Sequence, residues 1–177
     1  LTATNGIVDA NTGVSDALIT GDNLNLSVTS GSVGTAEQKL LVALTNAARI
    51  SASASASIYL AETQNSLTIG TVLAGGSAVL YSPYSFIDAL NSNQNNIVAG
   101  TINLHAEVSV GSDTQAFGVR ATSGDGVVIQ AGKHVYASTD DGDMVIDTIS
   151  AVQDVVLRSS HGVVDGVETD AANVTAA

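Results

Sequence analysis

The sequence predicts an all-β fold in which short strands wind into a parallel β-helix, a solenoid of stacked coils. Three observations lead to this prediction: apolar residues alternate with a period of two, a unit of about 77 residues recurs, and large rings are scarce. Aromatic residues make up 3% of the 177 residues and Trp is absent, so Val, Ile, Leu and Ala fill the core. Such a core suits thin, regularly stacked layers.

Alternating apolar residues mark the strands, because every second side chain of a strand points to the same face. Clusters of Ser, Gly, Asn and Asp between these segments indicate turns. The clearest alternating sets are Leu24/Leu26/Val28, Leu40/Val42/Leu44, Ile58/Leu60, Leu67/Ile69, Ile102/Leu104, Phe117/Val119, Val127/Ile129, Met144/Ile146 and Val155/Leu157. We count about five short strands in each recurring unit.

Two stretches are open to another interpretation. The stretch 38–49 has helical spacing of its leucines, but its counterpart 115–126 contains internal glycines, so we expect strands in both. The unbroken Ser/Ala alternation of 51–57 predicts a strand with Ala on the core face. A flexible linker is the alternative there, although the counterpart 128–134 has the pattern of a strand.

The repeat is visible when the chain is aligned on itself so that Val33 falls on Val110, because 33–88 then matches 110–165 without gaps. Identical pairs include Gly34/Gly111, Thr45/Thr122, Tyr59/Tyr136, Ile69/Ile146, Leu80/Leu157 and Asp88/Asp165. We therefore divide one continuous solenoid, 1–177, into the tail of a unit (1–10), two units (11–88 and 89–165) and the start of a further unit (166–177). Since the chain begins with Leu1 and shows no signal peptide, we expect it to belong to a longer protein.

A chain of small β-sandwich domains is the alternative architecture. Three features favour the β-helix. A unit of about 77 residues is short for a sandwich of about 100 residues, a central ring is missing, and apolar phrases recur at the intervals that successive coils would give. At roughly 20–25 residues per coil, the chain would form about seven or eight coils.

The charge of the chain excludes several functions. With 17 acidic and 5 basic residues, the net charge is −12, which disfavours nucleic acid and anionic membrane surfaces as partners. No apolar run reaches the length of a membrane-spanning helix, so membrane insertion is not expected. The absence of Cys excludes disulfides and Cys-based metal sites.

Several phrases resemble the repeats of filamentous-haemagglutinin-like bacterial exoproteins and adhesins. The phrases that carry the resemblance are Ile58-Tyr59-Leu60-Ala61-Glu62, Leu67-Thr68-Ile69-Gly70, Ala74-Gly75-Gly76-Ser77-Ala78-Val79-Leu80 and Phe86-Ile87-Asp88-Ala89. The resemblance implies a right-handed β-helix, secretion across the cell envelope and a stalk that projects an adhesive tip. The secretion domain of that family is not recognisable in this chain.

No residue pattern points to catalysis or to a bound cofactor. His105, His134 and His161 lie in separate phrases, and the last two pair with Ser57 and Tyr84 in the other unit. Neither a nucleophile elbow nor a phosphate-binding glycine loop occurs. We therefore predict that the chain is not an enzyme and has neither catalytic nor cofactor-binding residues.

The acidic cluster Asp140, Asp141 and Asp143 is the one candidate metal site, because Ca²⁺ prefers several carboxylate oxygens. Its counterparts Thr63, Gln64 and Ser66 contain no carboxylate, so a solvated turn is the favoured interpretation. Asp9, Asp88 and Asp165 each follow a β-branched residue, and we interpret them as turn-forming residues at coil corners.

These observations favour a structural function, a spacer or stalk segment of a giant secreted or cell-surface bacterial adhesin or fibre protein. The expected partners are neighbouring repeats of the same chain, and the expected location is extracellular. Two alternatives remain: a module that binds host or matrix glycans or proteins, and a filament subunit that self-associates through its end coils. The recurring pair Tyr59/Tyr136 is the only hint of an exposed aromatic row, since Tyr81 and Tyr84 pair with Arg158 and His161.

Overall fold

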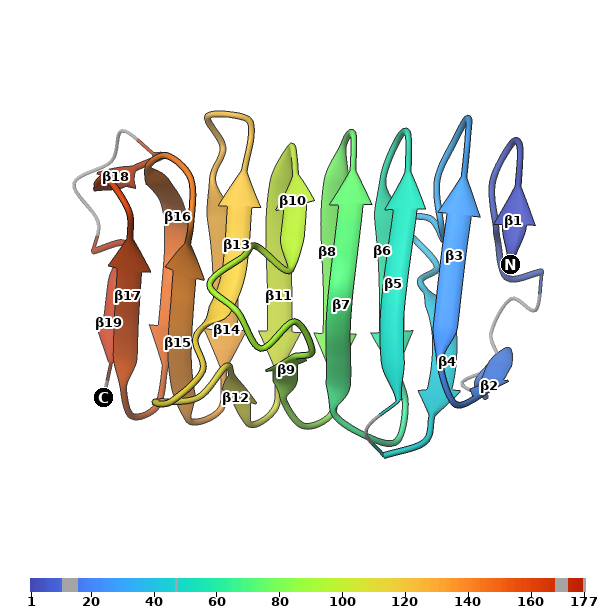
Figure 1. Cartoon of the computed structure of the whole chain (residues 1–177), viewed down its shortest axis with the longest axis horizontal. Helices are drawn as coiled ribbons and strands as arrows, with labels where there is room; N and C mark the ends of the chain where they lie inside the picture. The colour runs from blue at the N-terminus through green and yellow to red at the C-terminus, as the bar shows by residue number, and fades with distance from the viewer. Residues whose placement is uncertain (11–15, 47, 168–171, 177) are drawn as a thin grey trace.

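The computed structural model describes residues 1–10, 16–46, 48–167 and 172–176, and its regular elements are all strands. The strands form two sheets that face each other across one core, and coils stack along the long axis of the molecule (Figure 1). We call the ten-stranded sheet nearer the viewer in Figure 1 the front sheet and the nine-stranded sheet the back sheet. None of the described residues forms a helix long and apolar enough to cross a membrane.

The chain passes from one sheet to the other and back in each coil. The front sheet contains β1 (Thr2–Ala3), β3 (Leu24–Val28), β5 (Arg49–Ala54), β7 (Leu67–Ala74), β9 (Phe86–Asp88), β10 (Ile97–Ala99), β12 (Ser109–Val110), β13 (Phe117–Ala121), β15 (His134–Thr139) and β17 (Val155–Ser159). The back sheet contains β2 (Ile19–Gly21), β4 (Leu40–Leu44), β6 (Ile58–Glu62), β8 (Ser77–Ser82), β11 (Thr101–Ala106), β14 (Val127–Ala131), β16 (Met144–Ala151), β18 (Val163–Asp165) and β19 (Val174–Ala176).

Strand pairing confirms the parallel β-helix. All pairings between the described strands are parallel, and the solenoid has about eight turns. Coil length varies, since Leu24 pairs with Ile50, whereas Phe117 pairs with Ala137, a partner that is closer along the chain. Tandem sandwiches are therefore excluded, because one core cluster extends from Ile7 to Ala151 through all of these coils.

The core follows directly from the alternation in the sequence. Ala52 and Ala54 of β5 are buried, while Ser53 between them is exposed, which confirms a strand at the Ser/Ala stretch. The stretch with helical leucine spacing forms β4, as expected. Where rings do occur in the core they lie together, since Phe86 and Phe117 have ring centroids 5.9 Å apart.

The recurring unit spans three and a half turns, which the sequence did not indicate. From β4 to its equivalent β13 the chain passes along a wall seven times, because β9 and β10 form one pass of the front wall and β12 belongs to the same pass as β13. Since seven is odd, equivalent strands lie on opposite sheets. The equivalent pairs are β4 and β13, β5 and β14, β6 and β15, β7 and β16, β8 and β17, β9 and β18, and β10 and β19. Successive units are thus related by a half-turn about the axis and an advance of about 17 Å, given coils ~4.8 Å apart.

Local irregularities recur with the same half-turn relation. The pairing of β5 with β7 shifts register after Ile50, and the pairing of β14 with β16 shifts after Val127, the equivalent residue of the next unit. The count of about five strands per unit was low because segments of two or three residues, such as β12 and β18, give little alternation.

Two glycines fix equivalent corners of the coil. Gly34 and Gly111 have φ angles of 65° and 68°, the left-handed region that favours glycine. A Cβ at Gly34 would lie 2.3 Å from the backbone oxygen of Tyr59, and a Cβ at Gly111 would lie 2.3 Å from that of Tyr136. Each tyrosine belongs to a strand of the next coil. The identity of this pair in the sequence therefore reflects both a backbone conformation and a close approach of neighbouring coils.

Candidate functional site

Two adjacent loops interrupt the front sheet near the middle of the molecule. The first, 89–96, joins β9 to β10, and the second, 111–116, joins β12 to β13. The flanking strands are stacked, because β9 pairs with β12 and β10 pairs with β13. The loops consequently lie side by side on the outer face of the front sheet (Figure 1).

A buried clasp closes the base of the first loop. Asn96, which is fully buried, donates from Nδ2 to Asp88 Oδ1 at 2.5 Å and to the Ile69 oxygen at 3.0 Å. Its Oδ1 accepts from the Gly118 amide at 2.9 Å. Asp88 Oδ1 also accepts from the Leu90 amide at 2.6 Å, as expected of a turn-forming residue. Its expected place at a coil corner is wrong, because β9 and β10 on either side of the loop both belong to the front sheet.

The clasp recurs on the opposite sheet in the next unit. Asp165 Oδ1 accepts from Asn173 Nδ2 and from the Val167 amide, both at 2.8 Å. Asp9, the remaining member of this set, is also buried. The clasp is therefore a structural element of the repeat, and the sequence predicted its Asp but not its Asn.

Side chains from the second loop lock it to the first. Gln115 Nε2 donates to Asp88 Oδ2 at 2.6 Å and to the Ser92 oxygen at 3.0 Å. A further hydrogen bond joins Asn95 Nδ2 to Asp140 Oδ1, two coils farther along the axis. These contacts fix the positions of both loops, so the surface beside them is formed before any ligand binds.

A hollow of about 500 Å³ lies between these loops and the outer faces of β15 and β17. Its polar lining includes Asn93, Asp113, Gln115, Ser138, Arg158 and Ser160. Arg158 is exposed and makes no ion pair with another described residue, in contrast to Arg120, whose Nη1 lies 2.7 Å from Asp141 Oδ2. This hollow is the candidate site of the described part of the chain.

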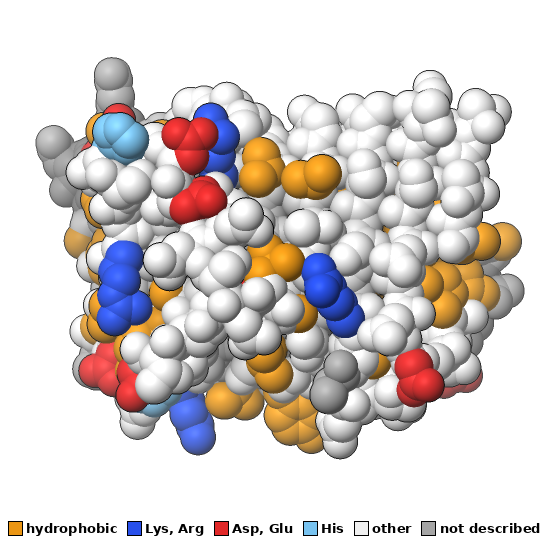
Figure 2. Space-filling view, in the orientation of Figure 1, with side chains coloured by type: hydrophobic (Ala, Val, Ile, Leu, Met, Phe, Trp, Pro, Cys, Tyr) orange, Lys and Arg blue, Asp and Glu red, His pale blue; other side chains and the backbone are white. Residues whose placement is uncertain are grey.

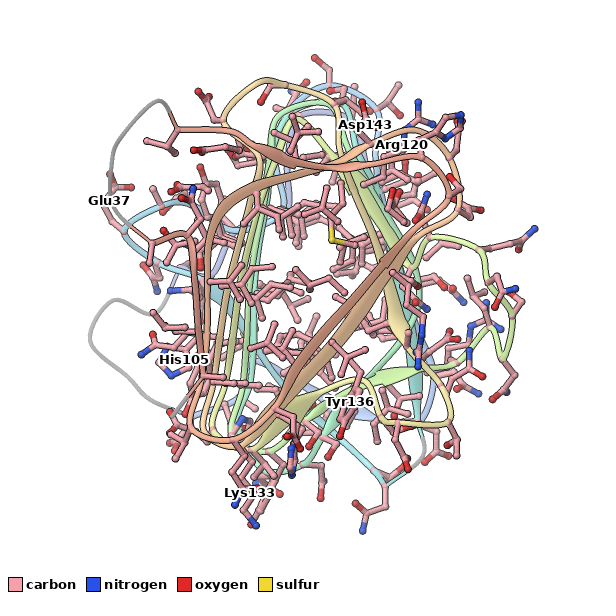
Figure 3. All side chains as sticks on the ribbon, turned by 90° about the vertical axis from the view of Figure 1, so that its left-hand side faces the viewer. Glu37, His105, Arg120, Lys133, Tyr136 and Asp143 are labelled. Carbon is pink, nitrogen blue, oxygen red and sulfur yellow. The ribbon has the colours of Figure 1, made fainter. Side chains whose placement is uncertain are left out.

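The three aspartates of the candidate Ca²⁺ site, for which the sequence favours a solvated turn, have different partners. Asp140 accepts from Asn95, Asp141 pairs with Arg120, and Asp143 Oδ1 accepts from the Gly162 amide at 2.8 Å. Figure 3 shows the labelled Arg120 and Asp143 at the same edge of the coil stack. Within the described ranges, no three His, Cys, Asp or Glu side chains are grouped so that they could hold a metal ion.

The three histidines lie apart, two of them beside a tyrosine and an acid. His105 Nε2 is 3.2 Å from Glu107 Oε1 on the back sheet, and its ring packs edge-on against Tyr81. On the front sheet, His134 Nδ1 is 2.8 Å from Asp154 Oδ2. Since the labelled His105 and Tyr136 lie on opposite sides of the solenoid (Figure 3), these groups do not converge on one site.

Nearby acids influence the tyrosines of these two groups. Burial, and then the Asp154 and Asp113 carboxylates, raise the pKa of Tyr136 above its ordinary 10.0. Burial and the Glu107 carboxylate likewise raise the pKa of Tyr81. Both phenols therefore stay protonated and neutral at pH 7. Because the Asp113 carboxylate acts on Tyr136, this phenol lies near the Asp113 side of the hollow.

Comparison with known proteins adds no assignment. No family model matches the chain, and no significant similarity to a curated protein or a solved structure was found. The candidate site therefore rests on geometry. Two of its lining residues stood out in the sequence: Asp140, in the acidic cluster, and Arg158, which aligns with Tyr81 of the other unit. Asp113 and Gln115 did not stand out, because residues of a loop do not follow the alternating pattern that marks strands.

Proposed function

We propose that the chain is a rigid spacer segment of a longer secreted or cell-surface bacterial adhesin or fibre protein. The observation that carries the proposal is the half-turn repeat. Because each unit continues the two walls and the core of the preceding unit, every additional unit lengthens the rod by about 17 Å. A spacer needs this property, a length that grows with repeat number without a change in cross-section.

The strands of the last described coil have the same geometry as strands that are covered one unit earlier. Val163 and Val174 are 52% and 42% exposed, whereas their equivalents Phe86 and Ile97 in the preceding unit are fully buried. The exposed valines belong to strands whose equivalents are covered by a further coil. A further coil stacked on β18 and β19 would bury both valines, so the wall can be extended at this end.

The surface location within this proposal rests on the resemblance to filamentous-haemagglutinin-like repeats and on composition. A strongly acidic chain, which repels its own copies, suits an extended protein that must stay soluble. The loops and hollow of the front sheet favour the adhesive alternative as a second function of the same segment, because they add polar surface that a plain spacer does not need.

The spacer proposal is tested by lengthening the rod. A variant that carries a second copy of residues 89–165 after Asp165 should remain monomeric and keep its β-sheet circular dichroism. Small-angle X-ray scattering should show a maximum dimension greater by about 17 Å, with an unchanged cross-sectional radius. A larger cross-section, or two beads joined by a linker, would show that the units do not form a continuous rod.

A further inference from the structure

We propose that the hollow beside the two front-sheet loops binds a neutral oligosaccharide. This proposal does not depend on the spacer function. The hollow, of about 500 Å³, has the size of a small-molecule pocket, and nine of its ten lining residues carry hydrogen-bonding side chains, whose carbon atoms add apolar surface beside the polar groups. An apolar ligand would leave these groups without partners, so the matching ligand carries many hydroxyl groups.

The lining offers both kinds of hydrogen-bonding partner that a sugar hydroxyl requires. Arg158 supplies only donors, and the Asp113 carboxylate supplies only acceptors. Both side chains are exposed, and neither has an ion-pair partner among the described residues. Ser138 and Ser160 also line the hollow, and each hydroxyl can donate or accept a hydrogen bond. A polyol can therefore donate to Asp113 and accept from Arg158 at the same time.

The walls of the hollow are held in place without a ligand. Gln115, which lines the hollow, uses its Nε2 for Asp88 and Ser92, so its side chain bridges the two loops. Asn95 joins the first loop to Asp140 on the far wall. A preformed polar surface reduces the entropy lost on binding, which matters for weak, hydroxyl-rich ligands.

The equivalent place on the back sheet shows that the fold does not require these residues. The counterparts of Ser138, Arg158 and Ser160 are Ala61, Tyr81 and Pro83, on strands of the same geometry. The counterpart of Asp113 is Ala36. The solenoid thus builds the same coils with less polar side chains at these four positions, while Gln115 and Asp140 keep polar counterparts in Gln38 and Thr63.

Charge decides between neutral and acidic sugars. Two carboxylates, Asp113 and Asp140, and one guanidinium, Arg158, line the hollow, in a chain of net charge −12. The surroundings therefore repel uronates and sulfated sugars, and Arg158 acts as a hydrogen-bond donor to hydroxyl oxygens. The front face beyond the hollow shows few acidic or basic side chains (Figure 2).

The test is an NMR titration of the ¹⁵N-labelled chain with maltotetraose, cellotetraose and mannotetraose, and with tetragalacturonate as the acidic counterpart. At least one neutral probe should cause saturable shifts of the amides of 113–116, 138–140 and 158–160, with a Kd of about 1 mM or lower. Arg158→Gln and Asp113→Ala should each weaken binding about tenfold.

Arg49→Gln is the matched control, because it removes one exposed cation of the same sheet at a residue that does not line the hollow. It should leave the affinity unchanged, and all variants should keep the melting temperature of the parent chain. Failure of all three neutral probes would overturn the proposal. Shifts confined to another surface, or tighter binding of tetragalacturonate than of the neutral probes, would overturn it as well.

Discussion

At the scale of single residues, the Asn96 side chain links several parts of the front sheet through hydrogen bonds. Its amide group joins the Asp88 carboxylate, the β7 backbone and the Gly118 amide of the following coil. Because the side chain is fully buried, water cannot replace these partners. The side chain therefore holds three successive coils of the front sheet together.

Replacing Asn96 with Ala should lower the free energy of unfolding by about 2 kcal/mol or more, since the Gly118 amide and the Asp88 carboxylate each lose a buried partner. Asn103→Ala, on the exposed face of β11, is the control and should change stability by less than about 0.5 kcal/mol. Urea unfolding followed by circular dichroism measures both. Equal effects would mean that the clasp does not stabilise the fold.

The ionisation of Tyr136 offers a second test at this scale. Because Asp154 and Asp113 contribute to its raised pKa, Asp154→Asn should move the pKa downward toward 10.0 without reaching it, as burial and Asp113 remain. An NMR titration of the tyrosine ring between pH 8 and pH 12 measures the shift. An unchanged pKa in the variant would show that the Asp154 carboxylate does not act on this phenol.

At the scale of elements, the two units provide matched positions in different surroundings. Leu80 in β8 is 2% exposed, and its equivalent Leu157 in β17 is only partly buried because no described strand covers that side. Leu80→Ala should therefore cost about 3 kcal/mol, and Leu157→Ala about 1 kcal/mol. Chemical unfolding of both variants tests this order. A larger loss at Leu157 would contradict the coil assignment.

Much of this element structure was predictable from sequence, because an inward residue at every second position leaves a visible pattern. The Ser/Ala stretch and the leucines of β4 are examples, since the repeat resolved both in favour of strands. The half-turn relation was not predictable. The alignment of the two units places β7 on β16 without revealing that they belong to different sheets, because both sheets bury the same kinds of residue.

The candidate site was less accessible to sequence reasoning. Arg158 stood out only as a mismatch with Tyr81, and Gln115 matches Gln38 in the other unit. Its contact with Asp88 depends on two loops that become neighbours only when coils stack. Long-range hydrogen bonds of this kind leave no spacing signal in a single sequence.

At the scale of the whole molecule, stacked strands and one continuous apolar core account for stability. The acidic turn 140–143 is tied down by Asn95, Arg120 and the Gly162 amide. We therefore expect the melting temperature to be the same in EDTA as in Ca²⁺. A marked drop on chelation, reversed by added Ca²⁺, would mean that a bound cation holds the coils together.

The half-turn repeat is tested most directly by engineered disulfides, because the chain has no Cys of its own. Val79 of β8 and Asn103 of β11 are stacked partners on the back sheet, whereas Leu73 of β7 lies on the front sheet. Stacked residues are ~4.8 Å apart, within the range that a disulfide spans. We expect Val79→Cys/Asn103→Cys to form an intramolecular disulfide on mild oxidation and Leu73→Cys/Asn103→Cys to keep free thiols. The reverse result would place the second unit in the same orientation as the first and contradict the half-turn.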